Sequence, residues 1–117
     1  MGLIYHIAYR ADWEAARAGG QYTMSSRGLT LAEQGFIHAS TAAQVAGTAN
    51  RFYAGEQDLI LLEIDEGRLR PELRYEAPPG GTELFPHIYG PLNLDAVSDT
   101  RPLQPGADGR FSDDWCR

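Results

Sequence analysis

Apolar residues in the first part of the chain follow two periods, one typical of strands and one typical of helices. The run LIYHIAY at residues 3–9 predicts a strand whose alternate positions face opposite sides of a sheet. Asp12 is suited to cap a short helix over residues 13–18, which the following Gly-Gly pair would end. A polar connection then leads to GFIHAS, residues 35–40, which predicts a second strand.

A second helix is predicted directly after this strand. Thr41 and Gln44 have the spacing of a capping box, in which each side chain hydrogen-bonds the backbone of the other residue. Val45, Ala49 and Phe52 follow at spacings of four and three residues, so they would form the stripe that faces the core.

The second half of the chain is predicted to be mostly strands. Residues 58–65, DLILLEID, contain a continuous apolar run, which favours a central strand covered on both faces. LRYEAP at 73–78 and LFPHIYG at 84–90 would be further strands, and Pro86 places the second of these at an edge or a bulge. Residues 94–103 would close the sheet.

The order of these elements favours an α+β fold over a doubly wound parallel sheet. A chain of 117 residues is short enough to form one domain around one core. We expect this domain to cover residues 1–104 and to be followed by a loosely packed tail, residues 105–117, which is rich in Gly and Asp.

The charge balance narrows the possible functions. The ten basic residues are all arginines and face sixteen carboxylates, which gives a formal net charge of −6. Such a chain lacks the basic surface of a general nucleic-acid binder. The absence of lysine excludes a P-loop lysine, a Schiff base and a Ser-Lys dyad. No apolar run is long enough for a membrane span, and the first residues lack signal-peptide features, so we expect a cytoplasmic location without a membrane partner.

Each of the three histidines lies within a short apolar run, at His6, His38 and His87. In the two later runs, a phenylalanine lies two residues before the histidine, on the same face of an extended strand. A hydroxyl-bearing residue, Ser40 or Tyr89, lies two residues after it. This pattern predicts a cleft with an apolar base and a polar rim.

Two interpretations of the histidines are open at this point. Either they line one pocket, or each is buried and donates a ring N–H to a backbone carbonyl. Three imidazoles in one pocket could hold zinc, but no two of them have the close spacing of known zinc motifs. A hydrolase based on Ser40 and His38 has less support, because no G-x-S-x-G elbow is present.

A third use of such a pocket is the binding of a phosphate-bearing ligand. Ser40 and Thr41 lie where a predicted strand passes into a helix N-terminus, whose free N–H groups attract anions. Arg51 on the same helix could add a charge-assisted contact, or it could pair with a surface carboxylate. No G-x-G-x-x-G follows a predicted strand, so a dinucleotide would not be bound in the Rossmann manner.

Five segments, in order, carry a resemblance to a known family: IYHIAYRADWEAARAGGQY, GFIHAST, ANRFYAG, DLILLEID and ELFPHIYGPL. Over residues 1–103 the chain resembles a small bacterial family catalogued as domain of unknown function 952. The fold of that family is thought to be similar to the ADP-ribosyltransferase fold, a split, antiparallel-rich α+β sheet that clasps NAD between its halves. The resemblance therefore implies NAD or an ADP-ribose-type compound as ligand or cofactor.

The resemblance also implies roles for particular residues in ligand binding. His6 and His38 would orient the ribose and a phosphate, and Ser40 with Thr41 is similar to a Ser-Thr element on a later strand of the transferases. An aromatic side chain would stack on the nicotinamide, and the candidates are Tyr89, Tyr53 and Phe36.

The catalytic position of the transferases has no clear counterpart in this chain. Those enzymes use a late glutamate that steadies the developing oxocarbenium ion, and the best stand-ins are Glu83 and His87. A histidine would not supply the same negative charge, which favours weak or absent transferase or glycohydrolase activity. The alternative is a non-catalytic small-molecule-binding or structural domain with buried histidines, or a three-histidine metal site.

Overall fold

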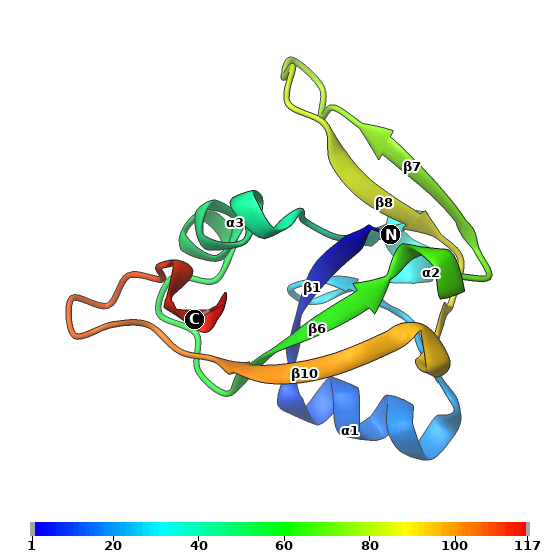
Figure 1. Ribbon diagram of the computed structural model, residues 1–117, viewed down its shortest axis with the longest axis horizontal. Helices are drawn as coiled ribbons and strands as arrows, with labels where there is room; N and C mark the ends of the chain where they lie inside the picture. The colour runs from blue at the N-terminus through cyan, green and yellow to red at the C-terminus, as the bar shows by residue number, and fades with distance from the viewer. Residues whose placement is uncertain (1, 117) are drawn as a thin grey trace.

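A three-stranded antiparallel sheet crosses the middle of the molecule, in the order β1 (Leu3–Tyr9), β6 (Leu59–Asp65) and β10 (Val97–Leu103) (Figure 1). The computed structural model describes residues 2–116, except for the side chain of residue 116. The apolar run in the middle of the sequence forms the central strand of this sheet, as predicted. The protein is an α+β fold of small antiparallel sheets and short helices.

Strand β6 is buried on both faces. Ile60, Leu62 and Ile64 belong to one hydrophobic cluster, whereas Leu59 and Leu61 belong to a second cluster on the other face. Both neighbouring strands run antiparallel to β6, so its double burial comes from helices and strands packed on each side and not from a parallel sheet.

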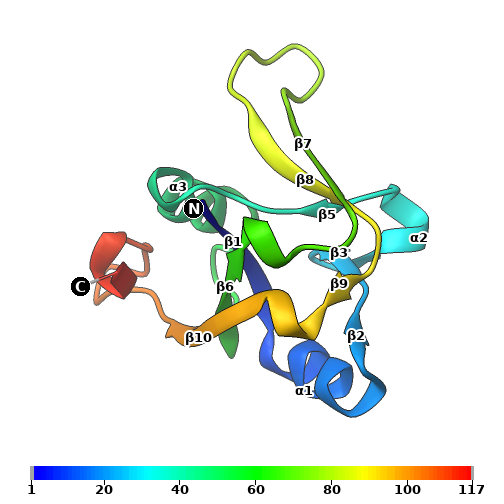
Figure 2. The same cartoon turned by 45° about the vertical axis from the view of Figure 1, so that its right-hand side comes forward.

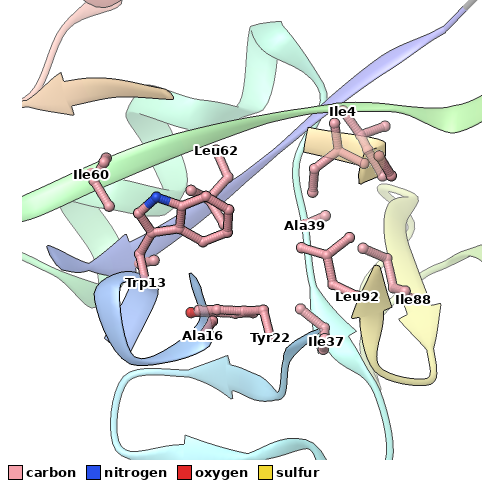
Figure 3. Close-up of a cluster of buried hydrophobic side chains, with 13 residues drawn as sticks. Ile4, Trp13, Ala16, Tyr22, Ile37, Ala39, Ile60, Leu62, Ile88 and Leu92 are labelled. Atoms are coloured by element: carbon pink, nitrogen blue, oxygen red, sulfur yellow. The ribbon is translucent and has the colours of Figure 1, made fainter. Parts of the chain in front are cut away.

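Helix α1 (Arg10–Gly19) covers the first face together with the two-stranded pair β2 (Gln21–Tyr22) and β9 (Leu92–Asn93). Figure 3 shows Trp13 of α1 and Tyr22 of β2 pointing into the cluster on this face.

The start of α1 differs from the prediction. Its N-cap is Tyr9, because β1 runs directly into the helix, so Asp12 lies in the first turn and is not the cap. The carboxylate of Asp12 still lies near the positive end of the helix dipole. The helix ends at Gly20, which has a φ of 96°.

The polar connection after α1 contains four elements that the sequence did not predict, of which β2 is described above. Strands β3 (Met24–Ser26) and β4 (Leu29–Thr30) pair with each other and lead into the short helix α2 (Leu31–Gln34). Thr30 and Glu33 form a capping box at the start of α2.

A second three-stranded sheet has the order β5 (Ile37–His38), β8 (Phe85–Tyr89) and β7 (Glu72–Glu76). Pro86 therefore lies in the middle strand, which corrects the predicted edge position. The strand tolerates it because β5 is short and the backbone of residue 86 is used there only as an acceptor: the Ala39 N–H donates to the Pro86 carbonyl at 3.0 Å.

Helix α3 (Val45–Phe52) packs against the second face of the central sheet. A 3₁₀ turn precedes it, and there the Thr41 N–H donates to the Gln44 side chain at 3.0 Å, which agrees with the predicted cap. Val45 is buried as expected, but Phe52 is 53% exposed. Phe52 ends the helix and stands outside the core.

The segment after β10 folds back onto α3, as Figures 1 and 2 show. In contrast to the loosely packed tail predicted from composition, Phe111 is only 4% exposed and belongs to the second cluster. Asn50 of α3 accepts from the Phe111 N–H and donates to its carbonyl, at 2.8 and 2.9 Å. Trp115 packs edge-on against Tyr5 at 4.8 Å. Residues 104–110, between these anchors and the sheet, are exposed.

The remaining short elements are 3₁₀ turns at Ala42–Gln44, Glu66–Arg68, Leu94–Ala96 and Asp113–Cys116. Within residues 2–116, no helix combines the length and the apolarity needed to cross a bilayer.

Candidate functional site

A cavity of about 850 Å³ lies where β1, β3, β5 and β8 meet helix α3. Its walls are rich in aromatic side chains, and the loop between β7 and β8 contributes Pro78 and Pro79 to one side. The volume falls within the range of small-molecule sites, roughly 300–1,000 Å³. The aromatic side chains that line it are Tyr5, Phe36, Phe52, Tyr53 and Phe85.

All three histidines line this cavity, but His6 is not free to contact a ligand through nitrogen. Its side chain is fully enclosed, with Nδ1 2.5 Å from the His38 carbonyl oxygen and Nε2 2.9 Å from the Tyr22 hydroxyl. A carbonyl only accepts, so Nδ1 carries the proton and Nε2 accepts from Tyr22. Burial lowers the pKa of His6 to about 4, so the ring is neutral at pH 7. His6 thus follows the interpretation of a buried, satisfied histidine.

His38 and His87 are direct neighbours across the β5–β8 pair. Their ring centroids lie 5.3 Å apart and the ring planes are nearly perpendicular, at 83°. Phe36 stacks on His87 at 4.0 Å. Burial, followed by the charge of His87, lowers the pKa of His38. Neither ring nitrogen of His38 is hydrogen-bonded to any residue that the structure describes.

Glu76 on β7 fixes the orientation of His87. Its Oε1 lies 2.8 Å from His87 Nδ1 and accepts from the Tyr89 hydroxyl at 2.5 Å. These hydrogen bonds, that of Tyr89 first and that of His87 next, lower the pKa of Glu76. Because the carboxylate accepts, Nδ1 carries a proton and Nε2 is the nitrogen left for a ligand. Within the described chain, Nε2 has no hydrogen-bond partner and is not enclosed, so it opens on the cavity that His87 lines.

Sequence reasoning missed Glu76 because its place beside His87 depends on strand register. Glu76 pairs with Phe85 and Arg74 pairs with His87, so Glu76 and His87 are diagonal neighbours. Residues 74 and 76 share one face of a strand by alternation, but nothing in the sequence shows which strand they meet.

Two serines line the cavity in different states. Ser40 is buried and its Oγ lies 3.1 Å from the Thr48 Oγ1, so its hydroxyl has a partner. Ser25 on β3 is 0% exposed, and its Oγ has no hydrogen-bond partner in the described chain. Ser25 was not a predicted site residue, because it lies in a segment for which the sequence predicted only a polar connection.

Arg51 lies on the wall that α3 contributes, and no carboxylate of residues 2–116 forms an ion pair with it. Its guanidinium lies 5.2 Å from the ring of Phe52. The other arginine at the cavity, Arg27, is paired with Glu56 at 2.8 Å.

Three of the predicted site residues lie away from the cavity. Glu83 lines a smaller neighbouring cavity of about 280 Å³ and accepts from the Gln44 side chain at 2.9 Å. Thr41 has its N–H turned to the same glutamine, and the Gln44 N–H returns to the Thr41 carbonyl at 2.9 Å, so these amides are not free for an anion. Tyr89 supports Glu76 from behind.

The arrangement does not form a metal centre. Among the described residues, no three side chains of His, Cys, Asp or Glu are grouped to hold an ion, which is consistent with both nitrogens of His6 being engaged. What the site can do is hold an anion or an aromatic ring, and accept a proton at His87 Nε2.

Residues 7–100 match the sequence model of the family described as Protein of unknown function (DUF952). The crystal structure of protein CC0527 from Caulobacter crescentus, a target of the Northeast Structural Genomics Consortium, is similar with a TM-score of 0.81 and 38% identity over 94% of this chain and 93% of that chain. The solution NMR structure of the same protein has a TM-score of 0.79 and 38% identity, over 96% and 93% of the two chains. Among curated proteins, no match is found.

Proposed function

Since this chain belongs to the family of proteins of unknown function DUF952, no activity comes with its family, and we propose from the cavity itself that it binds a small organic ligand carrying a flat ring and an anionic group. The observation that carries this proposal is the pair His38 and His87. The two imidazoles meet at the cavity with ring nitrogens that no described residue engages. A few polar groups that converge on a mostly apolar pocket are typical of a ligand site.

The aromatic walls support the flat ring. Phe52 is more than half exposed at the end of α3 although it lines the cavity, and a planar ligand would cover it. Aromatic pairs contribute roughly 0.5–1.5 kcal/mol beyond the area they bury.

Arg51 supports the anionic group. The protein carries a net charge of −6, yet this guanidinium at the cavity has no carboxylate partner among residues 2–116. An arginine in this state can offer a charge-assisted contact to a phosphate without first breaking an ion pair.

The specific ligands that we propose are NAD and ADP-ribose, which the resemblance to the ADP-ribosyltransferase fold implies. The cavity volume of about 850 Å³ is consistent with a ligand of this class. The roles of the residues change, however. His38, His87 and Arg51 would contact the ligand directly, whereas His6 would fix the backbone of β5 through the His38 carbonyl.

Calorimetric titration with NAD, ADP-ribose and adenosine tests this proposal. We expect saturable binding of ADP-ribose to the wild type, and binding about 10- to 100-fold weaker to Arg51→Ala, because a hydrogen bond to a charged group contributes about 1.5–3 kcal/mol. Arg110→Ala is the matched control, since that arginine is exposed and lies outside the cavity. Equal affinities in the two variants would exclude Arg51 from the site, and no binding of any of the three compounds would refute the proposal.

Slow cleavage of the bound nucleotide is a second candidate, favoured by the bond between Glu76 and His87. Water would attack the anomeric carbon of the ribose as the nicotinamide leaves, with the proton of the water passing to His87 Nε2 while Glu76 stabilises the imidazolium. We expect any NAD hydrolysis to fall in Glu76→Gln and to be unchanged in Glu83→Gln. The reverse pattern would return the catalytic role to Glu83.

A further inference from the structure

Three polar groups at one cavity have no partner in the described part of the protein: the hydroxyl of Ser25, the ring nitrogens of His38 and Nε2 of His87. Ser25 is the strongest evidence for a ligand among the three, because its side chain is 0% exposed. An enclosed hydroxyl without a hydrogen bond destabilises the folded protein, so its presence beside a cavity calls for an explanation by what binds there.

We propose that Ser25, His38 and His87 form an oxyanion subsite, in which a phosphate or carboxylate group of the ligand is bound. The inference rests on the proposed function, that this cavity holds an organic ligand, and adds which end of the ligand meets which residues. Ser25 donates through its hydroxyl, His38 through a ring N–H, and His87 through Nε2 when its ring is protonated. All three are short side chains carried by strands.

The fold brings the three residues together from three strands. His38 on β5 lies opposite His87 on β8 by register. Strand β3, which carries Ser25, packs against β5, and Figure 2 shows the two strands close together. Alternation along β3 turns Ser25 inward, with its neighbours Met24 and Ser26 only partly buried.

The charged groups around the subsite are compatible with an anion. Glu76 lies behind His87 and is occupied by His87 and Tyr89, so it stabilises an imidazolium facing the cavity. Arg51 on α3 faces the same cavity, whereas Arg27 is neutralised by its ion pair with Glu56.

The imidazoles of β1 and β5 complete the charge environment of the subsite. His6 is neutral and satisfied. Burial lowers the pKa of His38, and a bound anion beside the ring would raise this pKa. Binding near neutral pH should therefore take up a proton, which calorimetry detects as a dependence of the heat on the ionisation enthalpy of the buffer.

Ser25→Ala separates a ligand contact from a structural role. Removing an enclosed hydroxyl that has no partner should leave the stability of the ligand-free protein unchanged or raise it. The same change should weaken binding of an oxyanion by about tenfold, the loss of one hydrogen bond. Ser98→Ala is the control, because its hydroxyl lies on β10, outside the cavity, and already bonds Glu63.

The test is an NMR titration of the full chain with inorganic phosphate and, separately, with sodium acetate, following the ring signals of His38 and His87. Shifts of both signals that saturate, and that weaken in Ser25→Ala but not in Ser98→Ala, support the subsite. The ion that binds more tightly then distinguishes a phosphate from a carboxylate group. No saturable shift with either ion overturns the proposal, and so does an affinity that is equal in the two variants, since an enclosed water would then account for Ser25.

Parallel calorimetry with ADP-ribose and adenosine keeps the two proposals apart. Phosphate binding without ADP-ribose binding would leave the subsite standing and refute the nucleotide ligand. Adenosine and ADP-ribose binding with equal affinity would support a flat-ring site and overturn the oxyanion subsite.

Discussion

The buried imidazole of His6 should make the stability of the protein depend on pH in a defined window. In the unfolded chain His6 takes up a proton near its ordinary pKa of 6.5, whereas in the folded protein burial lowers this pKa to about 4. Between these values the unfolded state binds more protons, so the free energy of unfolding falls as the pH falls. The contribution is complete above pH 6.5 and is lost progressively toward pH 4. At about 1.4 kcal/mol per pKa unit, the loss is on the order of 3 kcal/mol.

Urea unfolding at several pH values from 7.5 to 4 measures this loss, with His6→Gln as the comparison. The glutamine is neutral at every pH in the window, so the free energy of unfolding should fall less steeply in the variant. His38, whose pKa is also lowered, contributes equally to both proteins. Carboxyl groups with a lowered pKa, such as Glu76, act mainly below their ordinary pKa of 4.5.

An equal pH dependence in the two proteins would refute this reasoning. So would an NMR titration in which the His6 ring of the folded wild type protonates near pH 6.5, and this second measurement does not require the variant to fold.

Further changes test the packing and the backbone. Phe111→Ala should destabilise the protein by about 3–5 kcal/mol in urea unfolding, as for a buried phenylalanine, while its exposed neighbour Arg110→Ala should change stability by no more than about 0.5 kcal/mol. Gly20→Ala, at a φ of 96°, should lower the free energy of unfolding by roughly 1 kcal/mol, whereas the adjacent helical Gly19→Ala should raise it by about 0.5–1 kcal/mol. Tyr22→Phe removes the hydroxyl that bonds the buried imidazole and should cost about 1–3 kcal/mol, measured in the same way. These predictions would be contradicted if Phe111→Ala left the free energy of unfolding unchanged, or if the two glycine variants were equally stable.

Local sequence patterns predicted those elements whose burial follows from the apolar or polar character of their own residues. The continuous apolar run at Leu59–Asp65 indicated a strand covered on both faces, and both clusters of the core meet it. The prediction that Phe52 faces the core was wrong. Spacing places a residue on one face of a helix, but it does not show where the core ends along that helix.

The candidate site depends on register and on contacts between strands distant in sequence. That His38 lies opposite His87 follows from the pairing of β5 with β8, which no local pattern specifies. Glu76 and Ser25 were missed for the same reason. Glu83 looked favourable in sequence because it precedes β8, but the loop turns it toward Gln44 and the neighbouring cavity.

The contact of His6 with the His38 carbonyl has a further consequence for motion. This hydrogen bond and the bridge between Tyr5 and Ser40 join the central sheet to the second sheet. The two sheets have separate backbone ladders, although both contribute side chains to the first hydrophobic cluster, and contacts between ladders can open locally. A ligand that holds His38 in place would stabilise these contacts between the sheets, so it should slow amide hydrogen exchange in β1 as well as in β5. The protection of Tyr5, whose N–H donates to the Ser40 carbonyl, would then report occupancy of the cavity from the opposite sheet.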